Sequence, residues 1–289
     1  KYMDQLKIFT ELSRINKPIG YMLLFWPCAW GLLIGYDFKN ENNIFYFYLI
    51  LFFLGSVLMR SAGCIINDIA DKNYDIRVER TKKRPIASGE VTVLTGYLIA
   101  GILCLLSFFI LINFNKFTIL LALASMPLAF TYPLMKRYTY WPQLFLGITF
   151  NYGLILGWTS INDQIDFVPI IFYVGSIFWT LGYDTIYGFQ DIKDDEIIGL
   201  KSTSIKFKNN PHIFLYLCYS LFLLALLAIG YLMSLNKFYF IFLIVILIQM
   251  FYFQIKKLDI YKPFKCLKIF KSNNFLGLLV FIGLLLGKL

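Results

Sequence analysis

The sequence has little of the chemistry on which most soluble enzymes depend. Its 289 residues include a single histidine, His212, and five scattered cysteines without a CxxC pair. A histidine-based metal cage and a Ser/His/Asp triad are therefore excluded, and the cysteines are expected to be small buried hydrophobic side chains. Charged residues are also scarce, at 15% of the chain against about 25% in soluble domains.

Apolar residues take their place. They make up 59% of the chain, with 30 Phe and 20 Tyr, against about 45–50% in an ordinary soluble domain. A soluble domain of this size could not bury so much apolar surface. The composition excludes a soluble enzyme, a disordered protein and a secreted disulfide scaffold. It predicts an integral membrane protein with one domain, residues 1–289.

The hydropathy pattern predicts nine transmembrane helices, because a helix needs about 20 mostly apolar residues to cross a bilayer. Lipid does not satisfy exposed backbone polar groups, so the expected fold is an all-α polytopic bundle. The predicted spans are residues 19–36, 44–66, 92–112, 117–135, 142–161, 167–187, 212–233, 238–255 and 274–287.

Basic residues alternate between two classes of loop. The N-terminal segment and four longer loops hold 22 of the 27 Lys and Arg residues, whereas the short loops and the C-terminal tail hold four. The positive-inside rule then predicts a cytoplasmic N-terminus, and it explains the net charge of +10 without a nucleic-acid partner. We expect a bacterial inner-membrane protein with its longer loops in the cytoplasm. These are residues 1–18, 67–91, 136–141, 188–211 and 256–273.

An acidic cluster follows the second predicted span. Asn67, Asp71 and Asp75 are spaced four residues apart, and Asp68 lies on nearly the same stripe of an extended helix. Like charges stacked in this way repel one another, so the arrangement gains nothing unless cations neutralise it. Carboxylate and amide oxygens suit a hard cation such as Mg²⁺, which commonly binds one or two carboxylates together with substrate phosphates.

A second acidic cluster follows the sixth predicted span. Asp184, Tyr187, Asp191 and Asp195 step along one helical face that starts inside the span. A solvated loop face could explain one cluster alone. Two clusters on the same side of the membrane instead suggest a facing pair, with metal ions bridging an anionic group between them.

Both acidic clusters are followed by basic residues, which is the combination that a metal–diphosphate needs. The alternative is that these residues only set topology and contact lipid headgroups. Lys136 and Arg137 form a basic pair after the fourth span, and Arg60 lies inside the second span, where it either reaches the surface or lines a cavity. The basic residues after the clusters are Arg77, Arg80, Lys82, Lys83, Arg84 and Lys201.

These residues resemble the UbiA superfamily of intramembrane aromatic prenyltransferases, over essentially the whole chain. The family patterns NDxxDxxxD and DxxxD stand here at residues 67–75 and 191–195, and nine helices is also the family's number. The segments at 14–27, 80–89, 131–137 and 183–187 favour the branch that prenylates 4-hydroxybenzoate in ubiquinone synthesis. Lys72 departs from the Arg of many relatives, which keeps the charge and loses the bidentate geometry.

The resemblance implies an electrophilic alkylation of 4-hydroxybenzoate, ortho to its hydroxyl, by a polyprenyl diphosphate. Mg²⁺ stabilises the departing diphosphate, and apolar and aromatic walls shield the allylic cation from water. The implied metal ligands are Asn67, Asp71, Asp75, Asp191 and Asp195. The implied substrate-binding residues are Arg60, Lys72, Arg77, Lys82, Lys83, Arg84, Tyr132, Tyr187 and Lys201.

Individual roles follow from the same resemblance. Arg137 is the first choice for the aromatic carboxylate and Arg60 the second. Asp71 or Asp191 orients or deprotonates the phenol, and Tyr187 holds the diphosphate or lines the cation pocket. Two other functions stay open on the sequence: prenylation of haem, dihydroxynaphthoate or homogentisate, and cation-coupled transport. The scarcity of charge at mid-membrane disfavours transport.

Overall fold

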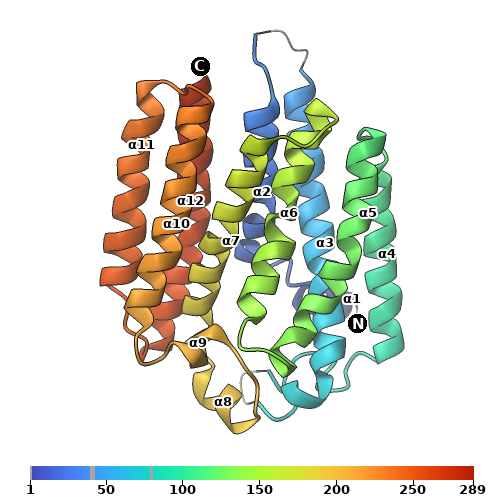
Figure 1. Cartoon of the computed structure of the whole chain (residues 1–289). Coiled ribbons are helices and arrows are strands. Elements are labelled where there is room, and N and C mark those ends of the chain that lie inside the picture. Colours follow the sequence, from blue (N-terminus) through green and yellow to red (C-terminus); the bar gives the residue numbers. More distant parts are fainter. Residues whose placement is uncertain (1, 40–42, 79–80) are drawn as a thin grey trace.

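The computed structural model describes residues 2–39, 43–78 and 81–289, and every regular element within these ranges is a helix. In the described ranges, nine segments are long and apolar enough to cross a membrane, which confirms the predicted fold class and span count. Figure 1 shows them as one upright bundle, with the C-terminus at one end and the short helices α8 and α9 at the other. We call the end with α8 and α9 the motif end.

The helix α1 (Tyr2–Ser13) precedes the first span, and α8 (Ile192–Ile197) and α9 (Thr203–Lys206) lie between the sixth and seventh. The spans are α2 (Pro18–Gly35), α3 (Ile44–Asp75), α4 (Val93–Leu111), α5 (Lys116–Thr131) with the 3₁₀ segment η1 (Tyr132–Arg137), α6 (Pro142–Asn162), α7 (Phe167–Gly188), α10 (Pro211–Leu232), α11 (Lys237–Leu247) with the π-helical segment η2 (Ile248–Lys256), and α12 (Pro263–Lys288).

Two predicted boundaries are wrong by several residues. Helix α3 continues past residue 66 to Asp75, so the first acidic cluster lies on a helix rather than in a loop. Helix α12 starts at Pro263 instead of residue 274, with its proline in the first turn, where the missing N–H costs nothing. Charged residues lower the hydropathy of both extensions, which is why a membrane-span criterion misses them. Part of the predicted short loop 37–43 lies outside the described residues.

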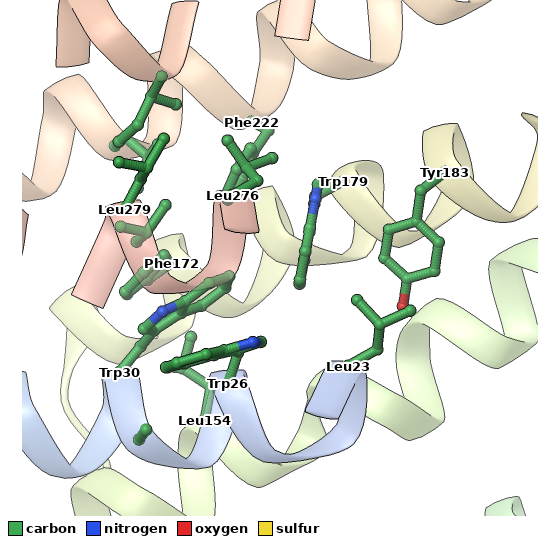
Figure 2. Close-up of a cluster of buried hydrophobic side chains, with 14 of the residues drawn as sticks. Leu23, Trp26, Trp30, Leu154, Phe172, Trp179, Tyr183, Phe222, Leu276 and Leu279 are labelled. Carbon is green, nitrogen blue, oxygen red and sulfur yellow. The ribbon is translucent and has the colours of Figure 1, made fainter. Parts of the chain in front are cut away.

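The centre of the bundle is aromatic (Figure 2). Trp30 of α2 stacks on Phe172 of α7 with centroids 5.4 Å apart, and Trp179 stacks on Phe222 of α10 at 5.8 Å. The two indoles lie 5.0 Å apart, and the Trp179 N–H donates to Asn273 of α12 at 2.9 Å. Buried aromatic rings with satisfied polar atoms therefore join α2, α7, α10 and α12.

Helices α2 and α6 approach each other at backbone distance. A Cβ on Gly31 would lie 2.0 Å from the Leu154 carbonyl oxygen, and one on Gly157 would lie 2.3 Å from that of Cys28. Small residues allow such close packing of transmembrane helices. The contact places α6 against α2, and η1, which contacts α6, also lies against α3.

Lys288 caps the C-terminal end of α2. Its Nζ donates to the carbonyl oxygens of Leu33 and Ile34 at 3.0 Å each, and to that of Tyr36 at 2.5 Å. These are C-terminal carbonyls, which have no partner inside the helix and carry partial negative charge. We expect Lys288→Met to lower the free energy of unfolding by about 1–3 kcal/mol. Thermal unfolding in detergent measures the loss, and an equal loss in the exposed control Lys116→Met would contradict this interpretation.

Candidate active site

Basic side chains from other segments surround the acidic motif of α3. Asp68 and Asp71 are 2% exposed and Asp75 is 7% exposed. The Lys136 Nζ donates to Oδ2 of Asp71, and the Arg137 Nη2 lies 3.6 Å from Oδ1 of the same carboxylate. Buried carboxylates on successive turns are tolerated because each one meets a cation.

Two arginines complete this pairing. The Arg84 Nη1 donates to Asp75 Oδ2 at 2.7 Å and to Asp68 Oδ1 at 3.1 Å, and Arg14 pairs with Asp68 as well. Burial alone would lower the pKa of the Arg14 guanidinium, but the interactions with its neighbours, first among them the Asp68 carboxylate, together raise the pKa. Arg14 also has a φ of 54°, which residues with a Cβ seldom adopt. The turn from α1 into α2 thus brings Arg14 to the motif through an unusual backbone conformation.

The segment η1 positions the two basic side chains that contact Asp71. The Arg137 Nη2 donates to the Ala70 carbonyl oxygen at 2.6 Å, and its guanidinium lies over the Tyr74 ring at 5.0 Å. Both contacts fix Arg137 against the last turns of α3. Its neighbour Lys136 is thereby held beside Asp71.

The residues that follow the second acidic motif are joined to η1 by a backbone hydrogen bond. Asp191 precedes α8 and Asp195 lies on it, and both side chains are half-buried. The Leu200 N–H donates to the Asp195 carbonyl oxygen at 2.9 Å, and the Lys201 N–H donates to that of Lys136 at 2.8 Å. Both motifs therefore lie at the motif end and share η1 as a neighbour (Figure 1).

The oxygens of the first motif suit a divalent cation. Asn67 Oδ1 and Asp71 Oδ1 are buried and have no hydrogen-bond partner, and both are hard donors of the kind that Mg²⁺ takes. Within the described ranges, no three acidic, histidine or cysteine side chains form a metal-binding group by themselves. The five-residue ligand set therefore stays a prediction, in which substrate oxygens complete the coordination.

A cavity of about 200 Å³ lies between α2, α3, α4, α5 and α6. Its lining is mostly apolar, with a few hydroxyl groups, and Arg60 contributes a charged group beside Tyr132. The Arg60 guanidinium lies 5.3 Å from the Phe150 ring centroid, and Tyr132 and Asp184 are close enough to act on its charge. A Cβ on Gly20 would lie 2.9 Å from Arg60 Nε, so the glycine leaves room for this side chain. Of the two positions considered for Arg60, the structure shows it lining a cavity.

The other predicted substrate-binding residues differ in exposure and in their contacts. Arg77, Lys82 and Lys83 are exposed, and Lys72 is half-buried. The Lys201 Nζ donates to the Tyr138 carbonyl oxygen at 3.3 Å, and the Tyr187 ring packs on Phe270 with centroids 4.5 Å apart. Arg80 lies outside the described residues.

The structure brings two residues to the first acidic motif, Arg14 and Lys136, to which the sequence assigns no role of their own. Arg14 belongs to a longer segment of the family resemblance, and Lys136 to a basic pair. The sequence signal for Lys136 is its spacing of four residues from Tyr132. The short segment η1, which carries both residues, links the cavity to the first acidic motif.

Comparison with known proteins identifies the family of this chain. The model of the UbiA prenyltransferase family matches residues 24–281. The chain belongs to this family. Like other UbiA prenyltransferases, it is an integral membrane protein. It is 41% identical over 288 residues to a 4-hydroxybenzoate octaprenyltransferase of Psychromonas ingrahamii, which covers 99% of this chain and 98% of that one.

Two further UbiA-type proteins extend the comparison. The mitochondrial 4-hydroxybenzoate polyprenyltransferase of Bos taurus is 41% identical over 289 residues, covering 98% of this chain and 76% of the relative. The solved structure of a UbiA homologue from Archaeoglobus fulgidus, bound to GPP and Mg²⁺, aligns with a TM-score of 0.67 at 18% identity. That alignment covers 96% of this chain and 99% of the homologue. The predicted family and the fold are confirmed.

Proposed function

We propose that this protein transfers a polyprenyl group from polyprenyl diphosphate to 4-hydroxybenzoate in ubiquinone biosynthesis. The observation that carries the proposal is the position of η1. Tyr132 at its start lines the apolar cavity, and Lys136 near its end binds Asp71 of the acidic motif. A cavity for an aromatic acceptor thus adjoins a charged site for diphosphate. The bacterial and mitochondrial relatives carry this activity in their names.

In this proposal the diphosphate binds among the charged groups of the motif end. Lys136, Arg137, Arg84 and Arg14, which now pair with carboxylates, would share the charge of its oxygens. Mg²⁺, held by Asn67, Asp71, Asp75, Asp191 and Asp195, supplies charge stabilisation for the leaving group. The Archaeoglobus homologue, bound to GPP and Mg²⁺, supports this pairing of ion and substrate.

The acceptor is assigned to the cavity, with Arg60 binding its carboxylate. Arg137, the first choice from the sequence, is already engaged by the Ala70 carbonyl, the Asp71 carboxylate and the Tyr74 ring. Arg60 instead faces an apolar space of molecular size, where a carboxylate would find a cation with little competing water. We therefore assign the acceptor carboxylate to Arg60 in preference to Arg137.

The reaction breaks the bond between prenyl C1 and the diphosphate oxygen, whose electron pair leaves with diphosphate. A bond forms between C1 and the ring carbon ortho to the hydroxyl, and that carbon then loses its proton to the released diphosphate or to water, which restores the aromatic ring. Phe150 and Tyr132, with centroids 6.3 Å apart, offer ring faces to the cationic carbon. Asp71 or Asp191 would orient the phenol, as the family resemblance implies.

The same proposal includes an orientation and a location. All nine spans form one domain in a bacterial inner membrane, with the N-terminus and the motif end in the cytoplasm. The concentration of 22 of the 27 basic residues in the N-terminal segment and the four longer loops supports this orientation.

An acceptor panel tests the proposed activity. Purified protein, polyprenyl diphosphate and Mg²⁺ are incubated with 4-hydroxybenzoate, dihydroxynaphthoate or homogentisate, and the lipid extract is analysed by mass spectrometry. We expect prenylated product from 4-hydroxybenzoate alone, none with a chelator, and recovery when Mg²⁺ is restored. Product from another acceptor, or activity that survives complete metal removal, would overturn the corresponding part of the proposal.

A further inference from the structure

A second pocket lies at the motif end, where η2 meets α12. It has a volume of about 820 Å³, and none of its lining residues belongs to either acidic motif. Four of the lining residues are lysines and one is an aspartate. They are Lys256, Lys257, Lys265, Lys268 and Asp259. The pocket is therefore a basic site separate from the proposed active site.

Little of this positive charge is neutralised. Asp259 Oδ2 lies 3.2 Å from the Nζ of Lys262 and 3.9 Å from that of Lys265. Lys256, Lys257 and Lys268 are exposed, and none of them has a carboxylate partner among the described residues. Such ammonium groups attract phosphate oxygens, which accept charge-assisted hydrogen bonds from lysine.

The pocket also lies at the depth of lipid headgroups. Lys256 ends the eighth span and Pro263 begins the ninth, so the pocket marks the border of two apolar segments. The chain between the lining residues carries exposed aromatic rings, with Tyr261 at 87% and Phe264 at 77% exposure. Exposed aromatic residues beside lysines are typical of the membrane interface.

We propose that this pocket binds the phosphate of an anionic phospholipid headgroup. Basic pockets between transmembrane helices bind such headgroups. Phe253 and Ile269 in the lining add an apolar wall for the first part of the acyl chains. A free phosphate makes no use of that wall, and the prenyl donor needs metal-binding carboxylates that a lone Asp259 does not provide.

Native mass spectrometry of the purified full chain tests the proposal. The protein is mixed with equal amounts of phosphatidylglycerol and phosphatidylcholine, and the lipid retained is measured. We expect selective retention of phosphatidylglycerol, weakened on the order of 100-fold in the triple variant Lys256→Gln, Lys257→Gln, Lys268→Gln. The matched control removes three exposed lysines elsewhere, Lys7, Lys116 and Lys237, and retains the lipid.

Each alternative has its own result. Equal weakening in both triple variants would mean that overall surface charge attracts the lipid, and would overturn the site. Equal retention of phosphatidylcholine, or displacement of phosphatidylglycerol by inorganic phosphate or by geranylgeranyl diphosphate, would overturn the choice of ligand. Thermal unfolding of each variant excludes loss of the fold as the cause.

Asp259→Asn provides a test of opposite sign. Removing the aspartate releases Lys262 and Lys265 from their ion pair. Binding of phosphatidylglycerol should tighten by about fivefold. Weaker binding in a folded variant would contradict the proposal.

Discussion

Replacing Asp71 by asparagine is expected to lower kcat/KM on the order of 10³-fold, the loss seen when a group that stabilises developing charge is removed. Asp71 is 2% exposed, and it meets Lys136 and Arg137 where we place the diphosphate. Asparagine keeps the shape of the side chain and removes its charge. The loss should therefore appear in turnover and in the dependence on Mg²⁺ concentration, with the protein still folded.

The matched control is Asp194→Asn. Asp194 lies on α8 beside Asp195 but outside the DxxxD positions. We expect this variant to keep activity within about threefold of the unaltered protein, as is usual for a substitution away from the chemistry. Initial rates at several Mg²⁺ concentrations measure both variants. Near-normal rates in folded Asp71→Asn would remove the acidic motif from the mechanism.

Replacing Arg60 by methionine is expected to raise the KM for 4-hydroxybenzoate about 100-fold and to leave the KM for the prenyl donor nearly unchanged. Loss of one partner of a buried charge pair costs about 2–5 kcal/mol. Arg60 lines the cavity and lies over the Phe150 ring, whereas the ion pairs of the first motif's carboxylates are made by other side chains. Its removal should therefore affect the acceptor alone.

Arg137→Met is the comparison that separates the two arginines. Arg137 contacts Asp71 and the backbone of α3, so its loss should lower kcat and disturb the donor and Mg²⁺. Steady-state kinetics with each substrate varied in turn give the KM for the donor and the KM for the acceptor in each of the two variants. If Arg137→Met raises the acceptor KM and Arg60→Met does not, the carboxylate belongs to Arg137, the first choice from the sequence.

The spans could be predicted from the sequence because the requirement that lipid imposes is local. Long apolar runs and alternating basic loops were sufficient for nine helices, and short, charge-poor loops fixed most boundaries to within two residues. The ends of α3 and α12 could not be predicted in the same way. Both helices carry charged residues beyond the apolar run, and only pairing of those charges, as between Asp75 and Arg84, lets α3 continue.

The acidic residues of the site could be predicted, whereas their partners could not. The four-residue spacing of Asn67, Asp71 and Asp75 matches the helical period, and it is visible within nine residues of sequence. Arg14 reaches Asp68 across 54 residues through a backbone angle that no pattern predicts. Lys136 reaches Asp71 because η1, which packs on α6, also lies against α3. Such contacts depend on tertiary packing, which spacing along the chain does not encode.

The central claim is that one site cleaves the prenyl diphosphate and passes the prenyl group to 4-hydroxybenzoate. A single-turnover reaction with purified protein, Mg²⁺ and both labelled substrates measures diphosphate and lipid-extractable product together. The account predicts that they form in equal amounts and at the same rate, and that both form on the order of 10³-fold more slowly in Asp71→Asn. Diphosphate without prenylated hydroxybenzoate would contradict the acceptor, and the absence of both from folded protein would contradict the transferase itself.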